Sequence, residues 1–295
     1  VRFGVNAGNS IASGGNYNVV LGDEAGTALT TGDNNVAIGF EALSTEDAHG
    51  NNTAVGYRSL KTLNAGGEGN NVAVGANAGT AMTTGTQNTV VGSDAGGALE
   101  GGNVNAFFGY QAGDALVNGS RNVAIGATAL TTDTQGDRSV AVGYGALSTQ
   151  NPATAANMYN VGVGYDAGAA VTTGTLNVYV GPLSGKDATT GTRNTALGNY
   201  SGASDQNSSG GSGDDNVWIG HQAGMKSSSA SDCAVVGAFA GDAITTGGAN
   251  TIMGYAAAGA LTVGTGNVAI GYQALDAETG GQESVAIGAN ALGAQ

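Results

Sequence analysis

The chain has 295 residues, of which 55 are glycine, and a formal net charge of −14 with only 8 Lys plus Arg. This charge has the wrong sign for the phosphate backbone of nucleic acid and for anionic membrane surfaces, so we expect neither as a partner. No apolar run approaches the roughly 18 residues that a membrane-spanning helix needs, so we expect no membrane insertion in this segment.

A nine-residue pattern recurs along the whole chain, as in residues 35–43, Asn-Val-Ala-Ile-Gly-Phe-Glu-Ala-Leu. Most copies lie seventeen residues apart, and a fixed short period predicts a solenoid in which each repeat forms one coil. We therefore predict an all-β chain, a parallel β-solenoid of about seventeen short coils. The central glycine of each copy, called the anchor glycine below, lies at Gly4, Gly22, Gly39, Gly56, Gly75, Gly92, Gly109, Gly126, Gly143, Gly164, Gly181, Gly198, Gly220, Gly237, Gly254, Gly271 and Gly288.

The residues before each anchor glycine alternate as a β-strand does. Val36 and Ile38 should point to one side and Ala37 to the other. We expect the two apolar columns to form the dry interior. The alanine column, which also admits large rings, should face outward. The predicted core ladder is Val36, Ile38, Val55, Val74, Ile125, Val142, Ile219, Ile270 and Ile287.

Two further columns flank the strand. The anchor glycine indicates either a positive φ or a close approach between coils. Asparagine recurs four residues before it, and stacked amides can form a hydrogen-bonded ladder. The predicted Asn ladder includes Asn35, Asn52, Asn71, Asn88, Asn122, Asn177 and Asn267.

Tyrosine often follows the anchor glycine directly. Amphipathic rings at regular spacing suit an interaction surface, but they equally suit packing over the adjacent alanine column, and both interpretations stay open. The candidate interaction column is Tyr57, Tyr110, Tyr144, Tyr165, Tyr255 and Tyr272.

The coils are connected by return segments with turn sequences such as Thr83-Thr84-Gly85. Three steps of the repeat are longer by two or more residues, and these extra residues always fall in the return segment. We therefore predict one continuous solenoid domain over 1–295, with longer loops near 61–70, 148–157 and 203–215.

Residues 267–275, Asn-Val-Ala-Ile-Gly-Tyr-Gln-Ala-Leu, resemble the head repeats of trimeric autotransporter adhesins, the YadA-like or haemagglutinin type. Residues 192–200 are similar to the Thr-Gly-x-x-Asn-Thr-Ala-x-Gly-Tyr arrays of tail-fibre-like proteins. The resemblance covers essentially the whole chain. It implies a left-handed β-roll that assembles as a homotrimer in an extracellular stalk or adhesive head. The period of seventeen is longer than that of the usual autotransporter head repeat.

Catalytic and metal-binding patterns are missing. His49 and His221 are the two histidines, and no spacing gives either the partners of a catalytic triad or a metal site. Residues 181–186 look like a phosphate loop, but Asp187 stands where Ser or Thr should bind magnesium. The calcium-binding nonapeptide is absent, although Asp33, Asp137 and Asp214 occupy matching return-segment positions. We predict no enzyme activity, cofactor or metal.

Three functions fit these observations. The first is an extracellular fibre or adhesin segment that associates with itself and meets a cell-surface receptor. The second is a filament subunit that stacks head to tail, because Val1 enters in mid-strand and Gln295 follows the last repeat without a polar cap. The third, an ice-binding solenoid, needs threonine in register on most coils, and paired threonines occupy the same position in only five return segments.

Overall fold

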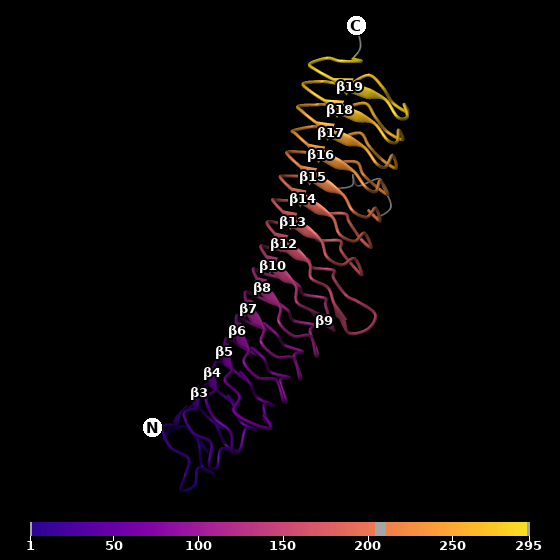
Figure 1. The fold of residues 1–295 in the computed structure, drawn as a ribbon. Coiled ribbons are helices and arrows are strands. Elements are labelled where there is room, and N and C mark those ends of the chain that lie inside the picture. Colours follow the sequence, from indigo (N-terminus) through magenta and orange to yellow (C-terminus); the bar gives the residue numbers. More distant parts are fainter. Residues whose placement is uncertain (1, 204–210, 294–295) are drawn as a thin grey trace. The chain divides into compact units, whose positions relative to one another are not determined.

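The computed structural model describes residues 2–203 and 211–293. Every regular element in these residues is a β-strand, and they include no helix that could cross a membrane. Strands one repeat apart pair in parallel, for example Val36 with Thr53 and Ile38 with Val55 (Figure 1). The chain is therefore an all-β parallel β-solenoid with a period of about seventeen residues, and these parts of the predicted fold class are confirmed.

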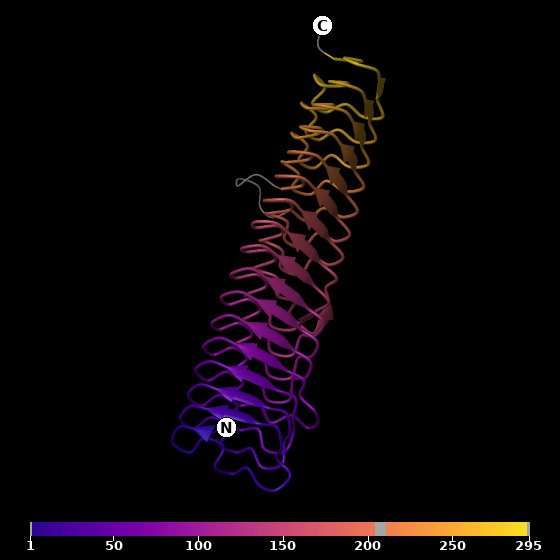
Figure 2. The same ribbon diagram turned by 90° about the vertical axis from the view of Figure 1, so that its left-hand side faces the viewer.

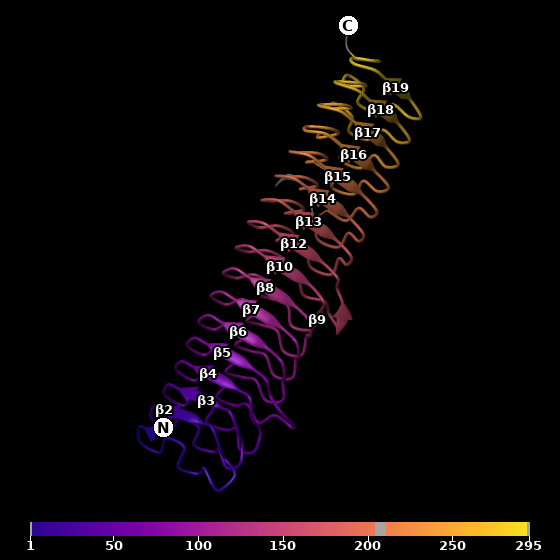
Figure 3. The same ribbon diagram turned by 60° about the vertical axis from the view of Figure 1, so that its left-hand side comes forward.

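The chain consists of two compact units, and each is a run of coils. Unit 1 is Val1–Val142 with Asn151–Asn157, and unit 2 is Gly143–Gln150 with Met158–Gln295. Within each unit the strands stack in register on one side of the coils, as Figure 2 and Figure 3 show from two directions. The strands of unit 1 are β1 (Arg2–Phe3), β2 (Val19–Leu21), β3 (Val36–Ile38), β4 (Thr53–Val55), β5 (Val72–Val74), β6 (Thr89–Val91), β7 (Ala106–Phe108), β8 (Val123–Ile125), β9 (Gly136–Asp137), β10 (Val140–Val142) and β11 (Ala156–Asn157). Those of unit 2 are β12 (Val161–Val163), β13 (Val178–Val180), β14 (Thr195–Leu197), β15 (Val217–Ile219), β16 (Ala234–Val236), β17 (Thr251–Met253), β18 (Val268–Ile270) and β19 (Val285–Ile287).

The structure reverses the predicted inside and outside of these strands. A three-residue strand sends one side chain inward, and this is the middle one: Ala37 is fully buried while Val36 and Ile38 are partly exposed. Phe107 and Tyr179, two of the large rings that were predicted to face outward, are buried in the same interior column. All nine predicted core residues lie instead in the two outer columns, namely Val36, Ile38, Val55, Val74, Ile125, Val142, Ile219, Ile270 and Ile287.

The interior is narrow, and a few complementary positions fill it. Where the fourth residue after the anchor glycine is Leu43 or Leu130, the interior column holds alanine and the seventh residue is polar, Glu46 or Asp133. All four of these side chains are fully buried. The coil anchored at Gly56 departs from this pattern by carrying leucine at both positions. In the other coils the fourth residue after the anchor glycine is mostly glycine. The space is then filled by a larger side chain in the interior column or by an apolar residue seven positions after the anchor glycine.

The aromatic rings of the interior column occupy the space that these glycines leave. A Cβ on Gly113 would lie 2.7 Å from Cε2 of Phe107. In unit 2 a Cβ on Gly185 would collide with the ring of Tyr179, and one on Gly224 with the indole of Trp218. Alanine is therefore the usual interior residue because of the space available, and a ring is accepted where glycine faces it.

The anchor glycines form the tightest corner of each coil. Gly39 has a φ of +131°, and a Cβ on it would collide with the carbonyl group of Gly56 in the next coil. Both explanations offered by the sequence therefore apply, because the backbone is left-handed there and the coils touch.

A hydrogen-bonded ladder of asparagine side chains runs beside this corner. Oδ1 of Asn88 accepts the backbone N–H of Asn105 at 2.9 Å, and its Nδ2 donates to the carbonyl of Gly102 at 2.8 Å. The amides thus bond mainly to the backbone of the next coil. Seven predicted positions are fully buried and accept such an N–H through Oδ1: Asn35, Asn52, Asn71, Asn88, Asn122, Asn177 and Asn267.

Candidate functional site

The first candidate surface is the outer sheet face, formed by the first and third residues of the three-residue strands. Val74 and Ile125 of unit 1 are 36% and 41% exposed, and Leu197 and Met253 of unit 2 are 46% and 51% exposed. From β2 to β8, in β10 and from β12 to β19 the face consists of Val, Ile, Leu, Met, Phe, Ala and Thr, with no charged residue. Each unit therefore presents a regular apolar surface, with side chains about 4.8 Å apart along each column.

The second candidate surface is the aromatic column after the anchor glycines. Tyr144 and Tyr165 stack with ring centroids 5.6 Å apart and an angle of 10° between the rings, and Tyr255 stacks on Tyr272 in the same way. The rings pack against one another across coils, and their outer edges stay about half exposed. In unit 1, Tyr57 stacks on Phe40. The predicted members Tyr57, Tyr110, Tyr144, Tyr165, Tyr255 and Tyr272 are all exposed.

Two of the predicted loops lie among the described residues. In 61–70, Leu63 and Ala65 are fully buried, and only residues 66–68 stand out together into solvent. Residues 151–157 are tied to unit 1 by pairing of β11 with β9 and by a hydrogen bond from Thr134 Oγ1 to Asn151 Oδ1. In the third loop, 203–215, residues 204–210 lie outside the described residues.

The acidic return-segment residues that suggested calcium have a structural role. In each of three pairs, an aspartate Oδ1 accepts the backbone N–H of the equivalent residue in the preceding coil. The pairs are Asp33 with Asn16 at 2.5 Å, Asp137 with Ser120 at 2.6 Å and Asp214 with Thr192 at 2.7 Å.

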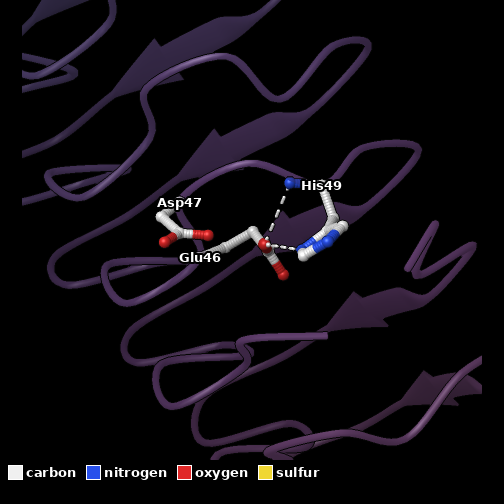
Figure 4. Close-up of side chains that lie close together, drawn as sticks. All are labelled: Glu46, Asp47 and His49. Atoms are coloured by element: carbon white, nitrogen blue, oxygen red, sulfur yellow. Dashed lines mark hydrogen bonds and ion pairs between the residues drawn. The ribbon is translucent and has the colours of Figure 1, made fainter. Parts of the chain in front are cut away.

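His49 has partners that the sequence did not indicate. Its Nδ1 lies 3.2 Å from Oε1 of Glu46, and ligand atoms of Glu46, Asp47 and His49 lie within 4.8 Å of one another (Figure 4). In the part of the chain that the structure describes, these are the only three such residues that gather in this way. The residue types are those that bind divalent transition metals.

The hydrogen bonds of Glu46 give this cluster a simpler role. Its carboxylate accepts the backbone N–H groups of His49 at 3.2 Å and Ala65 at 3.1 Å. Asp133 occupies the same position in another coil of unit 1 and accepts the N–H of Gly136 at 2.6 Å. Both buried carboxylates therefore cap the return turn of their coil. These carboxylates could have been found from the sequence as polar residues seven positions after an anchor glycine.

Unit 1 also carries an open polar groove of about 640 Å³. At one end, Glu41 binds Arg58 Nε at 2.7 Å and Lys61 Nζ at 2.8 Å. At the other end, burial raises the pKa of Asp114 above its usual value, and the charge of Asp94 raises it further. The groove offers charges of both signs to a polar ligand.

Comparison of the chain with family models, curated proteins and solved structures finds no match.

Proposed function

We propose that this chain is a non-enzymatic segment of an extracellular fibre or adhesin, of the bacterial-surface or tail-fibre type. Identical chains pack laterally through the outer sheet face, and the aromatic column and exposed loops meet a cell-surface receptor. The apolar, uncharged outer sheet face on a chain of net charge −14 is the observation that carries this proposal.

The energetics favour a second copy of the chain as the occupant. Fully burying a Val or Ile side chain contributes about 1.5–3 kcal/mol, so a half-exposed one contributes about 1 kcal/mol when it is covered. Two columns over many coils supply enough such contacts to exceed the roughly 4–15 kcal/mol lost when molecules associate. None of the acidic residues falls in these columns between β2 and β19, so copies meet there without like-charge contacts.

Three chains per assembly, and the left hand of the coil, come from the resemblance of residues 267–275 to trimeric adhesin repeats. In such an assembly the aromatic column and the loop at 66–68 remain available for attachment, because neither belongs to the outer sheet face. Loops on a rigid scaffold are the usual carriers of binding function.

Sedimentation equilibrium of the purified chain tests this proposal, and we expect a species near three times 28.4 kDa. The double variant Val74→Glu with Ile125→Glu places two charges on the outer sheet face of unit 1 and should reduce the mass to that of one chain. Ala76→Glu with Ala127→Glu is the matched control, because each change lies two residues later, after the anchor glycine, and should leave the trimer intact.

A monomeric wild-type chain at micromolar concentration would overturn lateral association. Open-ended filaments that grow with concentration, seen by negative stain, would favour the head-to-tail subunit instead. A trimer that persists in the Val74→Glu, Ile125→Glu variant, with an unchanged circular dichroism spectrum, would place the interface on another surface.

A further inference from the structure

The interior of unit 2 contains a small cavity beside the hydroxyl group of Tyr179. Its volume is about 20 Å³, and its lining includes Tyr179, Asn194, Asn216, Trp218 and Ser227. Holding one water molecule requires roughly 10–15 Å³, so the cavity accommodates water and nothing much larger.

The Tyr179 hydroxyl needs a partner. The side chain is 1% exposed, and within the described residues its oxygen has no hydrogen-bond partner. Burial raises the pKa of this hydroxyl well above its usual value, which the nearby Asn194 amide offsets in part. Buried polar groups in folded proteins almost always have a protein or water partner.

Asn194 cannot be that partner without breaking the asparagine ladder. Its Oδ1 accepts the backbone N–H and the Nδ2 of Asn216, at 3.1 and 2.9 Å. Its Nδ2 donates to the carbonyl of Gly213 at 2.8 Å and to Oδ1 of Asn177 at 3.2 Å. A side-chain amide has two donor hydrogens and two acceptor lone pairs, so the capacity of Asn194 is used.

The cavity follows from the residues that fill neighbouring coils. In unit 1, the coil of Phe107 has the large apolar Leu116 seven residues after its anchor glycine. In unit 2, the equivalent residues after Tyr179 and Trp218 are Ala188 and Ser227, which are much smaller. The space that leucine fills in unit 1 is therefore left beside the tyrosine hydroxyl.

We propose that a structural water molecule is bound in this cavity and accepts the O–H of Tyr179. Asn216 Oδ1 receives one hydrogen bond, from the N–H of Cys233 at 3.0 Å, so it has a second lone pair for a water hydrogen. Ser227 Oγ lines the same cavity and is the other acceptor. With these three partners the water has the two to four polar contacts that buried waters require.

Water-oxygen magnetic relaxation dispersion, which counts long-lived bound waters, tests the proposal together with a high-resolution crystal structure. We expect a water peak about 2.7–3.0 Å from the Tyr179 hydroxyl. Tyr179→Phe should lower the count of long-lived waters by one. Tyr255→Phe removes an exposed hydroxyl from the same unit and should leave the count unchanged.

A second variant removes the water and keeps the hydroxyl. Ala188→Val fills the cavity with the residue that Val171 supplies at the equivalent position of another coil in unit 2, and it should also lower the count by one. A wild-type structure without the water peak overturns the proposal. So does an unchanged count in either Tyr179→Phe or Ala188→Val.

Discussion

Phe107 in unit 1 and Tyr179 in unit 2 are both large rings in the interior column, but they pack beside different neighbours. Each replaces alanine in the interior column, each is almost completely buried, and each faces glycine four residues after the anchor. The coil of Phe107 adds Leu116, whereas that of Tyr179 adds Ala188. Three positions therefore share the interior of a coil: glycine at one of them makes room for a ring, and where the third residue is also small, as in the coil of Tyr179, a cavity is left.

The largest expected effect tests whether the rings depend on the glycines opposite them. Gly185→Ala should lower the free energy of unfolding by about 2–5 kcal/mol, because a left-handed residue with a side chain costs about 1–2 kcal/mol and overpacking adds about 1–3 kcal/mol. Gly79→Ala is the control, since its φ of +58° matches the +57° of Gly185, but its Cβ would meet the flexible ends of Leu60 and Met82 at 3.0 and 3.4 Å. Its cost should be about 1–2 kcal/mol.

Urea unfolding followed by circular dichroism measures both variants. Equal losses in Gly185→Ala and Gly79→Ala would mean that backbone strain alone decides the cost, and that the ring of Tyr179 does not depend on the glycine opposite it.

A double-mutant cycle at Phe107 and Gly113 tests the same idea in unit 1. Gly113→Ala should cost less in a Phe107→Ala background, because the ring that its Cβ would meet at 2.7 Å is gone. We expect a coupling free energy of about 1–3 kcal/mol from urea unfolding of the four proteins. Additive single and double changes would show that ring and glycine do not share the space.

Much of the fold could be predicted because the repeat is regular. The period, the strand positions, the corner glycines and the column of Asn35 and its equivalents all follow from spacing. Alternation along a strand separates two faces but does not say which one is inside. Reading Phe107 as a sign of exposure was wrong, because the compensating Gly113 lies six residues away in sequence and its meaning depends on how the coil closes.

The candidate site depended on the same missing information. The outer sheet face was visible as columns of Val and Ile but was assigned to the interior. The partnership of His49 with Glu46 depends on the return turn, whose course no periodic pattern specifies. Spacing therefore predicts which residues share a column, and packing decides which way each column points.

The smallest expected effect concerns Cys233, which stands in the asparagine ladder of unit 2. Its Sγ lies 3.5 Å from the carbonyl of Gly247, where Asn250 in the next coil donates to Gly264 at 2.9 Å. Cys233→Asn should restore the two hydrogen bonds that an asparagine side chain makes elsewhere in the ladder, one donated by Nδ2 and one accepted by Oδ1. It should raise the free energy of unfolding by about 0.5–1.5 kcal/mol in urea titrations at pH 7. A loss of stability would mean that the surroundings of Cys233 have no room for an amide.

The pH dependence separates the amide bonds from the thiol. Burial raises the pKa of Cys233, so above the unfolded value of about 8.5 the folded chain binds more protons than the unfolded chain. The contribution of the buried thiol to the free energy of unfolding is therefore fully present below the unfolded-state pKa. It is lost as the pH rises above that value toward the higher folded-state pKa. Cys233→Ser should remove the pH-dependent contribution of the thiol without adding an amide. Cys233→Asn should remove the same contribution and still have a higher free energy of unfolding at pH 7 than the wild-type chain. Unfolding midpoints between pH 7 and 10 that run parallel in all three proteins would show that the pKa of the thiol is the same in the folded and unfolded states. The gain in the asparagine variant, measured against serine, would then report the ladder bonds alone.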